Sequence, residues 1–210
     1  PRPVQLLYPI GLTGEEYVNA RAWEYARLKA CPNHPHGGCS LARHGTYERK
    51  TPRGCRVPRW YCRESHTTFS LLPDCLAARL PGTLRTLESV VNEAERASSL
   101  SSAAAALRPG PVGLEGARRW VRRRVERVHH ALNAVRGMLP DLLAGCEPEM
   151  GAVRARLPGT AALAVLRTEL DGQLSVVPAP LGFLPHGLGG RTRRGDIQQQ
   201  VGPDPPAAGG

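Results

Sequence analysis

Aromatic residues are scarce in this chain of 210 residues, at 5%, and Lys29 and Lys50 are its only lysines. Few side chains are therefore available to stack on unpaired bases, which makes RNA recognition less favoured than other roles. No apolar run approaches the ~20 residues needed to cross a bilayer, and the N-terminal residues lack the apolar core and cleavage site of a secretory signal. We therefore expect a cytoplasmic protein that does not enter a membrane.

Common catalytic motifs are also missing. The sequence has no nucleophile elbow, no P-loop and no dinucleotide-binding glycine motif, and Gly187 to Gly190 do not follow a predicted strand. Glu64 lies between Cys62 and His66, but the His-x-Glu and Pro-Cys-x-x-Cys pattern of a zinc deaminase is absent. We therefore expect no enzymatic activity.

Acidic residues are too few to balance the basic ones. The 28 lysines and arginines exceed the 18 aspartates and glutamates, which gives a net charge of +10 and a pI of about 10.0. A surplus this large in a small protein implies an acidic partner, with nucleic acid the first candidate and an anionic membrane surface the second. The 41% of hydrophobic residues is enough for a modest core.

Two groups of cysteine and histidine lie on either side of a predicted hairpin. Residues 31–39 contain Cys31, His34, His36 and Cys39, and residues 62–66 begin with Cys62 and end with His66. Structural zinc is usually held by two such short turns, with every tetrahedral position filled by the protein. Without an export signal, thiols stay reduced and more often bind metal than form disulfides. We therefore expect a structural Zn²⁺ ion.

The candidate metal ligands are Cys31, His34, Cys39, Cys62 and His66. Cys31 and Cys62 are the first choices because thiolates bind zinc tightly and each begins its half of the motif. His34 and Cys39 compete for one position: His34 gives a compact Cys-x-x-His turn, whereas Cys39 offers the softer ligand. The alternative interpretation is that these are ordinary loop and core residues.

The remaining cysteines and His44 have simpler interpretations. Cys55 follows a predicted hairpin turn and should be a bystander thiol. Cys75 and Cys146 stand among leucines and should be buried thiols. His44 is expected to pack or to face a phosphate rather than to bind metal.

Hydrophobic periodicity predicts an α+β chain. Helices are expected at residues 14–30, 84–96, 98–107, 114–139 and 161–170, and strands at 44–50, 56–61 and 67–72. Pro58 restricts the second strand to an edge position at best. The predicted regions are an N-terminal helix and arm (1–30), a small zinc ribbon of short antiparallel strands (31–80), an all-α helix-turn-helix-like region (81–145) and a poorly structured region (146–210) that ends in a disordered tail.

Arginines recur along the predicted hairpin and along helix 114–139. The residues expected to contact nucleic acid are Arg43, Arg49, Lys50, Arg56, Arg59, Arg118, Arg119, Arg122, Arg123 and Arg127. Arg124 falls on the apolar face of the helix, which breaks the pattern. Trp120 is interpreted as a core anchor in preference to a base-stacking residue. The alternative for the arginine run is a solvated helix face.

Several short segments together resemble a known family. Cys31-Pro, Arg43-His44-Gly45-x-Tyr47-x-Arg49, Arg59-x-Tyr61-Cys62 and the segment 68–73 (Thr-Phe-Ser-Leu-Leu-Pro) resemble the zinc-binding N-terminal region of insertion-sequence transposases and related small standalone bacterial proteins. The resemblance covers roughly residues 30–135. It implies a zinc ribbon followed by a helix-turn-helix, and binding to double-stranded DNA.

The chain departs from that family in two respects. His34 stands where the family has a second cysteine, and His66 lies one position later than the second ligand of the other turn. No spaced Asp, Asp and Glu set follows the helices, so two catalytic cations have no ligands. The resemblance therefore implies the DNA-binding part alone. The rival hypothesis is a zinc-stabilised interaction module that docks an acidic protein partner.

Overall fold

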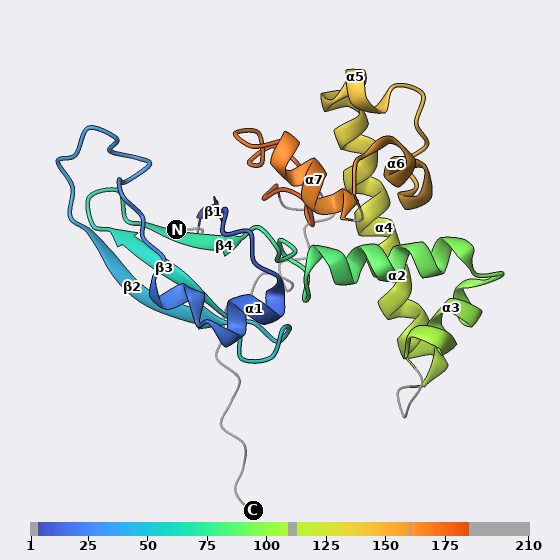
Figure 1. The fold of residues 1–210 in the computed structure, drawn as a ribbon. Coiled ribbons are helices and arrows are strands. Elements are labelled where there is room, and N and C mark those ends of the chain that lie inside the picture. The colour runs from blue at the N-terminus through green and yellow to red at the C-terminus, as the bar shows by residue number, and fades with distance from the viewer. Residues whose placement is uncertain (1–3, 109–112, 160, 185–210) are drawn as a thin grey trace, which may run out of the picture.

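The computed structural model describes residues 4–108, 113–159 and 161–184. Within these ranges the chain forms seven α-helices, a short 3₁₀ helix and one four-stranded sheet (Figure 1). The sheet and the first helix lie at one side of the molecule, and the other helices gather at the opposite side. The expected mixture of strands and helices is therefore confirmed. None of the helices in the described part is long and apolar enough to cross a membrane.

The sheet contains β1 (Val4–Tyr8), β2 (Leu41–Glu48), β3 (Arg56–Cys62) and β4 (Thr67–Pro73) in the order β1-β4-β3-β2. The strands β2, β3 and β4 pair in antiparallel fashion, as the predicted hairpin requires. β1 was not predicted, and it pairs with β4 in parallel, with Val4 opposite Phe69.

The prediction that Pro58 would confine its strand to an edge is wrong, because β3 lies between β2 and β4. Pro58 is paired with Thr46 of β2, whereas the pairing of β3 with β4 begins one residue later, at Arg59 opposite Ser70. A residue without an N–H is tolerated here because it lies beyond the end of the β3–β4 pairing.

The first helix begins where the sequence predicted and ends early. In α1 (Gly14–Asn19), Thr13 and Glu16 form a reciprocal capping box: the Thr13 hydroxyl accepts from the Glu16 N–H at 3.2 Å, and the Glu16 carboxylate accepts from the Thr13 N–H at 2.8 Å. Arg21 then adopts a left-handed backbone with φ of 46°, which stops the helix before the 3₁₀ turn η1 (Ala22–Glu24). The expected helix at residues 14–30 is therefore wrong beyond residue 19.

The long helices follow their predicted ranges closely. They are α2 (Leu84–Arg96), α3 (Leu100–Leu107) and α4 (Leu114–Met138). Thr83 caps α2, and its hydroxyl accepts from the Thr86 N–H at 3.0 Å. α2 packs across α4, and the buried face of α4 contains Val121, Val128, Leu132 and Val135.

Residues 146–159 and 161–184, which belong to the region expected to be poorly structured, contain helices and buried core residues. After α5 (Pro140–Leu143), which lies before this region, the chain forms α6 (Met150–Arg156) and α7 (Ala162–Glu169). Beyond them, Val177 and Leu181 are fully buried. The prediction of poor structure is therefore corrected for these residues, whereas the helix expected at residues 161–170 is confirmed by α7. α6 is short, so its apolar residues gave little periodicity, and both helices complete the core around α2 and α4. Residues 185–210, which include most of the predicted disordered tail, lie outside the described residues.

Candidate metal centre

The first half of the candidate centre is a chain reversal between η1 and β2. Within it, the His34 N–H donates to the Cys31 carbonyl at 3.0 Å, and the Gly37 N–H donates to the His34 carbonyl at 3.0 Å. Gly37 and Gly38 have φ of 86° and 82°, a backbone that favours glycine. These two residues turn the chain so that Cys39 returns beside Cys31 immediately before β2.

The second half is held by the sheet. Cys62 is the last residue of β3 and pairs with both Leu41 of β2 and Thr67 of β4. The loop after it is tied to the first half by Glu64, whose carboxylate accepts from the Ser40 N–H at 2.9 Å. The same carboxylate accepts from the Cys62 thiol at 3.6 Å.

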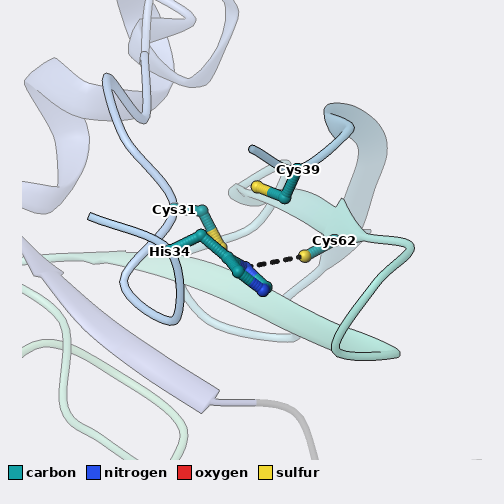
Figure 2. Close-up of side chains that lie close together, drawn as sticks. All are labelled: Cys31, His34, Cys39 and Cys62. Carbon is teal, nitrogen blue, oxygen red and sulfur yellow. Dashed lines mark hydrogen bonds between the residues drawn. The ribbon is translucent and has the colours of Figure 1, made fainter. Parts of the chain in front are cut away.

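Four potential ligand atoms meet where these halves approach one another. They belong to Cys31, His34, Cys39 and Cys62, and they all lie within 4.8 Å of one another (Figure 2). His34 Nδ1 is 3.5 Å from Cys31 Sγ and 3.5 Å from Cys62 Sγ. Tetrahedral zinc, with Zn–S of ~2.3 Å and Zn–N of ~2.0–2.1 Å, places sulfur and nitrogen ligands about 3.6 Å apart. The cluster therefore has the size of a metal site and can hold a metal ion.

Three sulfur atoms this close together favour a bound cation. Cys31 and Cys62 are buried, and Cys39 and His34 are partly exposed. Desolvation, together with hydrogen bonding to the neighbouring Cys31 and Cys62 thiols, raises the pKa of Cys39 to about 12. The Ser65 hydroxyl is the main cause that lowers the pKa of Cys62. Adjacent thiolates repel one another, and a divalent cation removes that repulsion because it is coordinated by the deprotonated form.

His66 is placed outside this cluster. Its backbone has a positive φ of 48°, and its exposed ring lies 3.1 Å from the Tyr61 hydroxyl, measured from Nδ1. His34 and Cys39, which the sequence treated as competitors for one position, both belong to the cluster. Four protein ligands leave no open position for a substrate, so the arrangement suits a structural ion.

Cys55 and His44, which were not expected to bind metal, lie outside the cluster. Cys55 is fully buried in a separate apolar group with Tyr17 and Trp23. His44 packs against Tyr61, with 5.6 Å between the ring centroids.

Two of the arginines expected to contact nucleic acid are bound to the protein backbone. Arg43 donates to the carbonyls of Trp23 and Glu24 at 2.7 and 2.9 Å. Arg49 donates to the carbonyls of Ala77 and Leu80. These two guanidinium groups therefore support the fold. Lys50 and Arg56 are exposed, and Arg59 lies over the Tyr47 ring, 6.0 Å from its centroid.

The arginines of α4 have different environments. Arg119, Arg122 and Arg123 are exposed, and Arg127 is partly buried. Arg118 forms an ion pair of 2.6 Å with Glu115. Within the described residues, Arg119, Arg122, Arg123 and Arg127 form no ion pair.

Arg124 is buried and lies 3.8 Å from the centroid of the Trp120 ring. Arg108, which follows α3, also lies over that ring, at 5.2 Å. The sequence showed that Arg124 interrupts the apolar face of α4. Nothing in the sequence indicated that Arg108 would join it.

The fold and the cluster together define a mixed α/β chain with a closed site of three cysteines and one histidine. No protein-family model matches the chain, and no curated protein or solved structure matches it either.

Proposed function

We propose that this chain is a zinc-stabilised DNA-binding protein that resembles the N-terminal region of insertion-sequence transposases and lacks their catalytic core. Zinc is the ion proposed because three thiolates and one imidazole in a closed tetrahedral set are the donors that structural zinc prefers. In this proposal, the two halves of the metal site and the strands β2 to β4 form the zinc ribbon.

The helices α2, α3 and α4 form the proposed helix-turn-helix-like region. The observation that carries the proposal is the exposed surface formed by Arg119, Arg122 and Arg123 in the first half of α4. Residues three or four apart share one face of a helix, so these side chains point in similar directions. Glu126 lies on the same face, but it forms no ion pair among the described residues. A face of unpaired arginines suits a polyanion.

The direct test is fluorescence anisotropy of a labelled random-sequence duplex at several salt concentrations. For about four phosphate contacts, the affinity should fall by roughly 100-fold between 50 and 200 mM salt. Arg119→Gln/Arg122→Gln should weaken binding. The matched control is Arg85→Gln/Arg156→Gln, which removes the same charge from exposed sites on α2 and α6 and should bind more tightly than the α4 variant.

Two results would overturn the proposal. One is the absence of duplex binding at micromolar protein, and the other is an affinity that does not change with salt. Either result would favour the rival function, in which the arginine face docks an acidic protein.

A further inference from the structure

A basic hollow lies between the end of α3 and the first half of α4. Its volume is about 280 Å³, and its lining consists of Arg108, Gly116, Arg119, Trp120, Arg123 and Arg124. Five of them come from α4, as Gly116, the pair Arg119 and Trp120, and the pair Arg123 and Arg124. Successive members of this series are three or four positions apart, so they lie along one side of the helix. Four of the six lining residues are arginines, and none is acidic.

Arg124 is the unusual member of this group because it is 93% buried, with a relative exposure of 7%. A guanidinium carries five N–H donors. Within the described residues, Arg124 donates one hydrogen bond, from Nη1 to the Trp120 carbonyl at 3.2 Å. No carboxylate in the described part of the chain forms an ion pair with Arg108, Arg119, Arg123 or Arg124.

Trp120 brings two of these cations together. The guanidinium groups of Arg124 and Arg108 lie 3.8 and 5.2 Å from the centroid of its ring. Contact with the electron-rich ring compensates each charge in part. The two groups still repel each other, and burial followed by the charges of Arg108 and Arg123 lowers the pKa of Arg124 to about 10. Trp120 also packs against the small apolar cluster of Ala104, Ala117 and Val121.

A bound anion would balance the positive charge of these four arginines. Phosphate suits it better than a single carboxylate, since it presents several oxygens and up to two charges to converging guanidinium forks. We propose that the hollow formed by Arg108, Arg119, Arg123 and Arg124 is a phosphate-binding site. The identity of the ligand rests on the proposed DNA-binding function. Where that function holds, the ligand is a phosphate of the DNA backbone at the face of α4.

The first experiment is isothermal titration of the full chain with inorganic phosphate at low ionic strength. We expect one site per chain. Arg108→Gln should weaken phosphate binding about tenfold, because it removes one charged hydrogen-bond donor from the ligand. Arg124→Gln should have a similar or larger effect, and circular dichroism should show that both variants are folded. The control variant Arg85→Gln/Arg156→Gln should bind phosphate as the unmodified chain does.

The second experiment measures duplex DNA affinity for the same variants. A parallel loss of DNA affinity in Arg108→Gln and Arg124→Gln supports a backbone phosphate as the ligand. Phosphate binding by a chain that does not bind DNA supports the site and overturns the DNA-binding function. The site is overturned by the absence of saturable phosphate binding, or by folded Arg108→Gln and Arg124→Gln variants that bind phosphate as tightly as the unmodified chain. Either result leaves the DNA-binding function to its own test.

Discussion

Arg167 Nη1 donates to the backbone carbonyl of Leu76, with 2.6 Å between the two atoms. Through this bond, α7 is attached to the segment that follows β4. The same guanidinium donates to the carbonyls of Asp74, Pro180 and Leu181 at 2.9, 2.6 and 2.8 Å. One buried side chain therefore joins the end of the sheet, the last helix and the segment after it.

Replacement of Arg167 should strongly destabilise the fold. Arg167→Met fills much of the same space but leaves four carbonyls without this donor, so we expect a loss of at least about 3 kcal/mol in the free energy of unfolding. Burial lowers the pKa of Arg167 to about 10, so the group stays protonated at neutral pH. Urea denaturation measures the loss. Arg156→Met, at an exposed position of α6, is the control and should change stability by less than about 0.5 kcal/mol. Similar effects of the two variants would contradict this role.

Glu95 should make stability depend on acid pH. Its carboxylate is 2.8 Å from His129 Nε2 and accepts from the N–H groups of Met150 and Gly151 at 2.8 and 3.2 Å. Desolvation acts to raise its pKa, but these interactions outweigh desolvation and lower the pKa below 4.5. The contribution to stability is therefore present above the unfolded-state pKa and is lost as the pH falls through the folded-state pKa.

We expect Glu95→Gln to lose about 1–2 kcal/mol at pH 6 and less at pH 3. Denaturant unfolding of both proteins across this range gives the difference directly. Glu93→Gln removes a carboxylate from the same helix and is the matched control. A Glu95→Gln deficit that grows toward acid pH would have the wrong sign for this account.

Two glycines should respond to alanine in opposite directions. A Cβ at Gly182 would collide with the side chain and carbonyl of Val177 and would lie 2.6 Å from the Leu174 carbonyl. Gly182→Ala should therefore cost about 1–3 kcal/mol. A Cβ at Gly151, within α6, meets no heavy atom within 4 Å, and Gly151→Ala should stabilise the helix by about 0.5–1 kcal/mol. Thermal unfolding of the pair tests this, and a shift in the same direction for both would contradict it.

The sequence predicted those elements whose signals are local. Thr83 and the repeated apolar residues define α2 and α4 without reference to the rest of the chain. β1 was missed because its five residues gain their strand pairing from β4, which is far away in the sequence. The segments at residues 146–159 and 171–184 were missed because their structure depends on tertiary contacts, such as those that Arg167 makes with Pro180 and Leu181.

Only part of the candidate metal centre was predicted, again because the sequence shows local spacing and not long-range contacts. Cysteine and histidine spacing identified both halves. The choice among ligands depends on side-chain directions, which the spacing does not determine. Gly37 and Gly38 return Cys39 to the cluster, whereas the turn after Cys62 leaves His66 beside Tyr61. The proposed phosphate-binding hollow was not predicted, because it depends on the contact of Arg108 with Trp120. That contact joins the end of α3 to α4.

The metal content of the purified chain, measured by inductively coupled plasma mass spectrometry, tests the central claim most directly. We expect about one zinc ion per chain, since a closed four-ligand site binds a single ion. His66→Ala and Cys55→Ser should retain it, because neither residue belongs to the cluster, and Cys39→Ser and Cys62→Ser should lose it. A purified chain without stoichiometric metal, or a site that survives Cys39→Ser and is lost in His66→Ala, would contradict the account.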